Sequence, residues 1–309
     1  MTRLYTHPSA LSHLTPDGHP EQVARIERIL QAVEKVEGLD WCDVPEADDT
    51  AILRVHPQSY LDRLAAASPA EGITQLDPDT WMSPGTLKAA HHAATASHTA
   101  VDAVLSNGGN AFVAMRPPGH HAETARPMGF CLFGNVAIAA KHALDHHGLS
   151  RVAVVDFDVH HGNGTQDLLW DEKRALVITS QQMPLWPGTG DPSERGAHGN
   201  VINIPLPPNS DGAVMRQAYE AQVFPALEEF APELLLISAG FDAHADDPLA
   251  QLRWTTADFV WLTRRLCDIA ARHCAGRVVS VLEGGYDLDA LAEAVAAHVG
   301  VLVEEETRQ

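Results

Sequence analysis

Short apolar runs alternate along the chain with stretches of helical periodicity. Six runs are mostly continuous, as in strands of a parallel sheet covered on both faces: Ala111–Met115, Val152–Phe157, Ala175–Thr179, Val201–Pro205, Leu234–Ser238 and Arg277–Leu282. The helices expected between them are Pro20–Val36, Thr86–Leu105, Asn135–His147, Gly212–Phe230, Thr256–Cys274 and Leu288–Glu304, with Thr255 or Thr256 as an N-cap. The alternation predicts one doubly wound α/β domain over residues 1–309, with a mainly parallel sheet flanked by helices.

Composition narrows the class of protein. The 309 residues are 45% hydrophobic and 20% charged, as in ordinary globular proteins, and the formal charge of −20 argues against a nucleic-acid partner. Since no apolar run could span a bilayer or serve as a signal peptide, and the four cysteines lack a disulfide framework, we expect a cytoplasmic protein that does not bind membranes. Loops at 77–85 and 183–196 could gate a site or pair two chains, so a homo-oligomer stays open.

Polar clusters follow five of the apolar runs directly. They are RPPGHH, DVHHGNG, QQMPLWPGTG, GFDAHADD and EGGYD. In open α/β sheets the ligand crevice lies beyond the carboxyl ends of the strands. We therefore expect the five clusters to converge on one site.

The polar residues that follow the predicted strand Val152–Phe157 indicate a metal site. Asp158 and His160 are two residues apart, so on an extended strand they point to the same side, and Asp242 ends another strand. Two carboxylates and one imidazole with an open fourth position suit catalytic Zn²⁺. Each residue alone is better explained as a hydrogen-bonded buried side chain, but the set favours a metal.

Two further segments supply candidate catalytic groups. His120 and His121 stand in a Gly/Pro loop after a strand, where a neutral imidazole could take a proton from water. Other tandem histidines, His91–His92 and His146–His147, fall in helical patterns and are interpreted as uninvolved. Tyr286 follows two glycines and could donate to a developing oxyanion.

Together the motifs resemble those of the zinc-dependent histone deacetylase-like amidohydrolases. This superfamily includes histone deacetylases, acetylpolyamine amidohydrolases and acetoin-utilisation proteins. The matching segments span nearly the whole chain: GHPEQVAR, RPPGHH, GFCLFGN, DFDVHHGNGTQ, PGTGD, SAGFDAH and EGGYD. The resemblance implies an arginase-like α/β fold.

The resemblance also implies roles for individual residues. It implies one Zn²⁺ per chain on Asp158, His160 and Asp242, with His121 as general base and acid, His120 as its electrostatic partner and Tyr286 as oxyanion donor. A structural K⁺ is implied on Asp156, Ser180 and the backbone carbonyls of Asp158 and His160. Phe130 and Trp186 match the aromatic walls of an acyl-lysine tunnel, Gly129 and Gly285 match glycines beside it, and Arg25 matches an arginine near its foot.

Two positions depart from parts of that family. Asn163 stands where some members carry an Asp that supports the second histidine. In having Asn at this position, the chain resembles the class II-like and bacterial branch of the family. Because Asn is uncharged, His121 should hold its proton less tightly than it would beside an Asp. Leu249 stands where polyamine-specific members tend to carry an acidic gate residue, which weakens the polyamine alternative.

The resulting functional prediction is zinc-dependent hydrolysis of N-acyl lysine side chains, with acetyl as the expected acyl group. The partner would be an acetylated lysine or a small acetylated amine. An acetylpolyamine amidohydrolase is the first alternative. More distant ones are a dinuclear manganese ureohydrolase, suggested by the string Asp242–Asp246, and a non-catalytic module that binds acylated amines.

Overall fold

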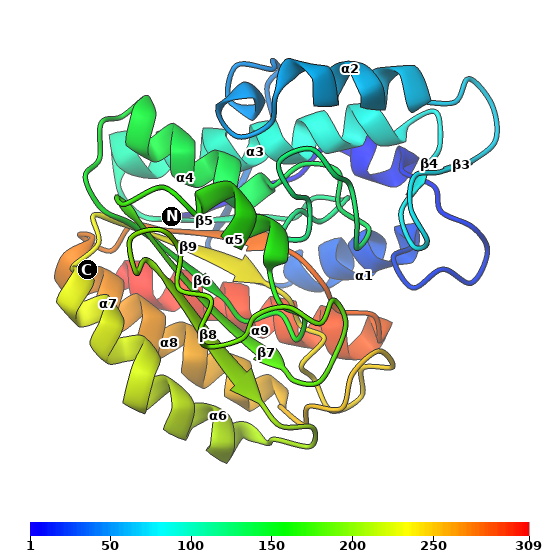
Figure 1. The fold of residues 1–309 in the computed structure, drawn as a ribbon. Coiled ribbons are helices and arrows are strands. Elements are labelled where there is room, and N and C mark those ends of the chain that lie inside the picture. Colours follow the sequence, from blue (N-terminus) through cyan, green and yellow to red (C-terminus); the bar gives the residue numbers. More distant parts are fainter. Residues whose placement is uncertain (309) are drawn as a thin grey trace.

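The computed structural model describes residues 1–308 and confirms the mainly parallel α/β architecture (Figure 1). Eight strands pair in parallel in the order β2-β1-β5-β10-β9-β6-β7-β8. Their bounds are β1 Thr2–Tyr5, β2 Leu39–Cys42, β5 Asn110–Val113, β6 Val152–Asp156, β7 Ala175–Gln182, β8 Val201–Leu206, β9 Leu234–Ala239 and β10 Val278–Leu282. A small antiparallel pair joins β3 (Thr74–Gln75) to β4 (Trp81–Met82).

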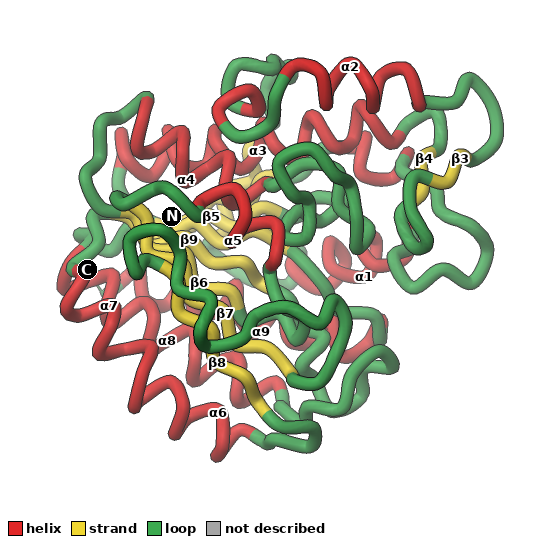
Figure 2. The backbone as a smooth tube through the Cα atoms, viewed as in Figure 1, coloured by secondary structure: helices red, strands yellow, loops and turns green. Residues whose placement is uncertain are grey.

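Helices cover both faces of the central sheet, as Figures 1 and 2 show. One face carries α2 (Gln58–Ala67), α3 (Thr86–Asn107), α4 (Asn135–Asp145) and α5 (Asn163–Leu169). The other carries α1 (Val23–Val33), α6 (Gly212–Ala218), α7 (Phe224–Phe230), α8 (Thr256–His273) and α9 (Leu288–Thr307). Every residue of β6, β7, β9 and β10 is consequently buried, which explains why these strands are rich in apolar residues.

All six predicted strands are present, and the largest difference is β7, which runs on to Gln182. The predicted helix Pro20–Val36 is shorter, because Pro20 lies in a bend before the N-cap Gln22. The predicted helix Gly212–Phe230 is interrupted by a π-helical turn, η3 (Tyr219–Val223). Thr255 is confirmed as the N-cap of α8, where it forms a capping box with Asp258.

The strand order explains why distant segments meet. The chain passes from β5 to β6 across the positions that β10 and β9 later fill, so the carboxyl ends of β5, β10, β9 and β6 are neighbours. Such a reversal of strand order is where open α/β sheets bind their ligands. In the part of the chain that is described, no helix combines the length and apolar character needed to cross a membrane.

Candidate functional site

Asp158 and His160 follow β6, Asp242 follows β9, and the structure brings all three together. One ligand atom from each residue lies within 4.8 Å of the others, and the side chains are almost fully buried. His160 Nδ1 lies 3.2 Å from Asp158 Oδ1 and 3.1 Å from Asp242 Oδ2. The three predicted zinc ligands therefore face one common point.

The charges and the backbone around this point fit a divalent cation. Burial and the neighbouring Asp158 raise the pKa of Asp242 to about 6, because two buried carboxylates repel each other. Although burial lowers the pKa of His160, the two carboxylates raise it to about 10. A Cβ on Gly284 would lie 2.3 Å from Asp242 Oδ2 and 2.5 Å from Asp158 Oδ2, so only glycine allows this close packing. One imidazole and two carboxylates match the ligand types of catalytic zinc sites.

The side chains predicted to hold K⁺ lie on β6 and on its neighbour β7. Asp156 ends β6, and its Oδ1 accepts a hydrogen bond of 3.1 Å from the Asp158 amide. Ser180 in β7 shares a 2.7 Å hydrogen bond with the Tyr219 hydroxyl. Both side chains are buried, and the potassium assignment stays a prediction.

The two loop histidines lie against each other beside the metal-ligand group, with ring centroids 3.8 Å apart and the ring planes tilted by 42°. His120 Nδ1 lies 2.9 Å from Asp156 Oδ2, and its Nε2 lies 3.7 Å from Asp158 Oδ2. Although burial lowers the pKa of His120, these two carboxylates raise it well above the usual range. His120 therefore lies in a strongly negative environment.

His121 has a neutral partner instead. Its Nδ1 lies 2.8 Å from Asn163 Oδ1, while Asn163 Nδ2 donates to Glu123 Oε1 at 2.9 Å. Because Glu123 accepts from the amide nitrogen, the amide oxygen faces His121, and Nδ1 must carry the proton. The lone pair of a neutral His121 is then on Nε2.

A pocket of about 180 Å³ leads from the surface to these groups. Aromatic and aliphatic side chains supply much of its wall, and the full lining is Asp79, His121, Gly129, Phe130, His160, Leu185, Trp186, Leu249 and Tyr286. A larger hollow of about 630 Å³ lies elsewhere, and its lining includes none of the predicted site residues. Because predicted catalytic and metal-ligating residues line the smaller of these two pockets and not the larger, the smaller one is the candidate active site.

The loop after β10 places Tyr286 in that pocket. Gly285 has a φ of +122°, a conformation that side chains other than glycine resist. Arg25 lies beneath the Tyr286 ring, 5.0 Å from its centroid, and donates to the carbonyls of Gly285 and Glu283 at 2.6 Å each. Arg25 thus supports the loop without lining the pocket.

Several strand-end residues point elsewhere. His161 is held by Thr189 and Gln166, and Asp287 caps the N-terminus of α9. Asp246 is exposed and pairs with His244, so the string Asp242–Asp246 does not add a second group of ligands around Asp242. This arrangement disfavours a dinuclear ureohydrolase.

Sequence reasoning missed two buried acids around the site, Glu283 and Asp247. Glu283 accepts hydrogen bonds from the amides of Gly119 and His120 at 2.6 and 3.1 Å, and burial raises its pKa to about 7. Asp247 accepts from the Tyr286 amide at 2.7 Å. Asp79, a half-buried loop carboxylate, also lines the pocket and accepts from the Gly129 amide at 3.1 Å. A signal existed for Glu283, because it directly follows the buried run VVSVL.

Comparison with known proteins agrees with this geometry. A family model described as Histone deacetylase domain matches residues 19–302. The chain belongs to the histone deacetylase family. The histone deacetylase-like amidohydrolase of Pseudomonas aeruginosa is 39% identical over 97% of this chain and 78% of its own. An uncharacterized Synechocystis protein, slr0245, is 43% identical over 92% of this chain and 94% of its own.

A solved structure of this family has the same fold. The HDA15 HD domain superposes with a TM-score of 0.92 at 29% identity, covering 99% of this chain and 89% of that one. The chain is thus a histone deacetylase-family protein whose relatives are named as deacetylases and amidohydrolases, which supports a hydrolase activity.

Proposed function

We propose that this protein is a zinc-dependent deacetylase that hydrolyses N-acetyl-lysine side chains to acetate and the free amine. The observation that carries the proposal is the pocket, which joins apolar walls to His121, His160 and Tyr286. Apolar walls suit the methylene chain of lysine, and the polar groups suit the amide at its end. Residues 1–309 would form one catalytic domain, with a structural K⁺ on Asp156 and Ser180.

The catalytic roles follow from the hydrogen bonds. Zn²⁺ held by Asp158, His160 and Asp242 would polarise the amide carbonyl and make water more acidic. Nε2 of His121 would accept a proton from the attacking water. His121 would then donate this proton to the departing amine nitrogen. His121 can do so because Asn163 fixes its ring with Nδ1 protonated. The Tyr286 hydroxyl would donate to the amide oxygen as negative charge develops on it.

The pocket wall favours a lysine side chain over a polyamine. Leu249 lines the pocket, and an aliphatic side chain does not attract the second ammonium group of an acetylpolyamine. Trp186 stands at the rim with 41% of its surface exposed, where it could contact a larger substrate. Four free cysteines, three of them buried, are consistent with a reducing cytoplasm.

The deciding experiment compares turnover of the zinc-loaded enzyme on three substrates. These are an acetyl-lysine peptide, N-acetylputrescine and a peptide with a longer acyl chain. We expect the highest kcat/KM on the acetyl-lysine peptide. A strong preference for N-acetylputrescine would replace this proposal with the polyamine alternative. No turnover on any of them, with zinc bound, would refute the proposed substrate and leave the fold assignment unchanged.

A hydroxyl deletion tests the role of Tyr286. Tyr286→Phe should lower kcat by about 10²-fold or more, the usual scale for one oxyanion donor. Tyr5→Phe, on strand β1 and outside the pocket lining, is the matched control and should retain wild-type kcat. Equal turnover of the two variants would remove Tyr286 from the mechanism.

A further inference from the structure

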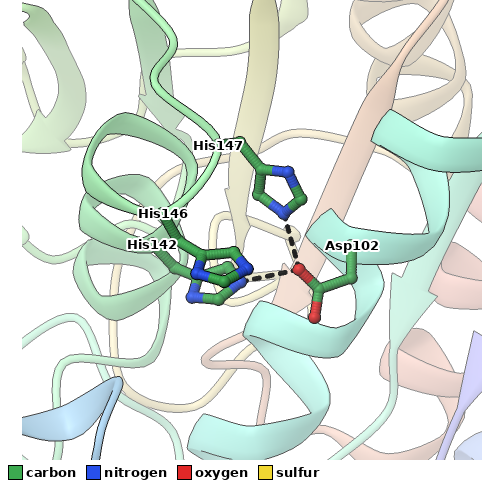
Figure 3. A group of neighbouring side chains, drawn as sticks. All are labelled: Asp102, His142, His146 and His147. Carbon is green, nitrogen blue, oxygen red and sulfur yellow. Dashed lines mark hydrogen bonds and ion pairs between the residues drawn. The ribbon is translucent and has the colours of Figure 1, made fainter.

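A second group of histidines gathers at the other end of the sheet. Asp102 lies near the end of α3, His142 is in the last turn of α4, His146 is its C-cap, and His147 follows. One ligand atom from each of the four lies within 4.8 Å of the others. Figure 3 shows His142 and His147 both directed at Asp102, with His146 alongside. His146 and His147 thus lie outside the candidate active site, as their helical pattern indicated, but they belong to this separate group.

The carboxylate of Asp102 is approached by two imidazoles at one oxygen. His142 Nε2 and His147 Nε2 each lie 2.6 Å from Asp102 Oδ1. The rings of His142 and His146, four residues apart on the helix, stack with centroids 4.6 Å apart and an interplanar angle of 15°. Histidines at this spacing share one helix face, which is a common way to bind a transition metal.

Hydrogen bonding within the protein leaves part of this group unsatisfied. His142 is 7% exposed, and its Nδ1 is buried without a hydrogen-bond partner within residues 1–308. His98 packs against His142 with ring centroids 4.9 Å apart, and neither of its buried ring nitrogens has a hydrogen-bond partner there, although Nδ1 lies 4.0 Å from Asp102 Oδ2. Buried polar atoms are normally paired, so such a concentration of unpaired imidazole nitrogens requires an explanation.

Electrostatics at this end of the molecule favour a cation. The group lies toward the C-terminal ends of both α3 and α4, where helix dipoles carry partial negative charge. The Asp102 carboxylate adds a full negative charge. The charges of Asp48 and Arg54 also reach His98, but they are opposite in sign and largely cancel there.

We propose that Asp102, His142, His146 and His147 form a second metal site, which binds a divalent transition metal ion such as Zn²⁺. Three imidazoles and one carboxylate are ligands that zinc, nickel and copper accept, whereas calcium and magnesium prefer oxygen alone. Tetrahedral zinc ligands lie about 3.3 Å apart, so the two histidines must separate slightly from Asp102. His146 is exposed and His147 half-buried, which leaves these side chains room to adjust.

This site would stabilise the protein and take no part in catalysis. It would join the C-terminal ends of α3 and α4, which precede the amino ends of β5 and β6. The candidate active site lies at the carboxyl ends of the same sheet. Loss of the second ion should therefore reduce thermal stability and leave turnover unchanged.

Metal counting tests the proposal. Wild type, His147→Ala and His146→Ala would be equilibrated with buffered free Zn²⁺ and analysed for zinc per chain. His198→Ala is the matched control, since His198 is an exposed histidine that pairs with another carboxylate, Asp171, at 3.0 Å. We expect one zinc fewer per chain in His147→Ala than in wild type and His198→Ala, and weaker binding in His146→Ala.

Thermal unfolding gives a second readout. Added Zn²⁺ should raise the Tm of wild type and His198→Ala by a few degrees more than that of His147→Ala, because zinc stabilises the folded state and this variant keeps only the zinc proposed at the carboxyl ends of the strands. Wild-type zinc content in both His147→Ala and His146→Ala would overturn the proposal. The difference between variants counts this site alone, so the result does not depend on the zinc or activity at the carboxyl ends of the strands.

Discussion

Gly284 shows how closely the backbone approaches the candidate zinc ligands. A methyl group there would lie 2.3 Å from Asp242 Oδ2 and 2.5 Å from Asp158 Oδ2, far inside van der Waals contact. Gly284→Ala should therefore displace both carboxylates. Loss of correct ligand orientation typically weakens metal binding by about 10- to 100-fold, and a similar loss is expected here in zinc affinity measured by competition with a chelator.

A second glycine serves as the control for Gly284. Gly300 lies in α9, and an added Cβ would have no heavy atom within 4 Å. Gly300→Ala should leave zinc affinity unchanged and raise the free energy of unfolding by about 0.5–1 kcal/mol, because alanine favours the helix. Wild-type zinc affinity in Gly284→Ala would show that the ligands are not packed against this backbone.

At the residue scale, the sequence predicted the side chains that stand at strand ends. Asp158, His160 and Asp242 could be found because each breaks or follows an apolar run, and such residues share one edge of a parallel sheet. Glu21 and Asp247 could not be found in this way. Glu21 pairs with Arg116, and Asp247 accepts from the Tyr286 amide. Both partners are distant in sequence, and only the three-dimensional structure shows that these carboxylates are buried against them.

At the scale of elements, a buried ionic network joins α1 to the ends of β5 and β10. Glu21 Oε1 accepts from Arg25 Nη1 at 3.0 Å, and Glu21 Oε2 accepts from Arg116 Nη2 at 2.6 Å. Arg25 in turn holds the backbone carbonyls of Glu283 and Gly285. All three charged side chains of the network, Glu21, Arg25 and Arg116, are fully buried. The network therefore connects the packing of α1 to the loop that carries Tyr286.

Removing the negative charge from this network should destabilise the protein strongly. Glu21→Gln keeps the shape of the side chain but leaves two buried arginines without their carboxylate. Breaking a buried ion pair in this way costs about 3–5 kcal/mol. Urea unfolding would measure the loss. Glu34→Gln, an exposed position at the end of α1, should change stability by less than about 0.5 kcal/mol, and a similar small effect at Glu21 would contradict the role of the network.

Element prediction succeeded where patterns were long and failed where they were short. Strands β6 and β9 are apolar up to the polar residues near the site, β10 is apolar except for Ser280, and all three were predicted nearly to their ends. By contrast, β1 has only four residues, and β2 exposes Trp41 at the sheet edge, so neither gives a clear pattern. Helix α5 begins inside the polar HHGNG segment, where tertiary contacts outweigh the weak helical propensity of Asn and Gly.

At the scale of the whole molecule, the two ends of the sheet have different uses. The carboxyl ends of the strands hold the candidate active site, and the ends of α3 and α4 beside the amino ends hold the second histidine group. Between them lies a continuous apolar core. That core contains one fully buried histidine, His298, whose ring contacts Phe112, Phe157 and Phe241.

The hydrogen bonds of His298 suit its neutral form. Thr263 Oγ1 donates to the Phe259 carbonyl, so it accepts from His298 Nδ1 at 2.7 Å. His298 Nε2 then accepts from Ser280 Oγ at 2.9 Å. Burial lowers the pKa of His298 to about 3, because the apolar surroundings disfavour the charged ring. Acid should therefore favour the unfolded chain, in which this histidine can take up a proton.

The pH dependence of global stability tests this conclusion. Since the folded pKa of His298 lies below the unfolded value, its stabilising effect is complete above about pH 6.5 and is lost as the pH falls toward about 3. Between pH 7 and pH 5 this one group should lower the free energy of unfolding by about 2 kcal/mol. His298→Gln should lack that part of the decline in urea unfolding. Thr263→Ala, which keeps the histidine, should be less stable at both pH values but retain the wild-type slope. If His298→Gln and wild type lose the same stability between pH 7 and pH 5, His298 is not the group that makes the folded core sensitive to acid.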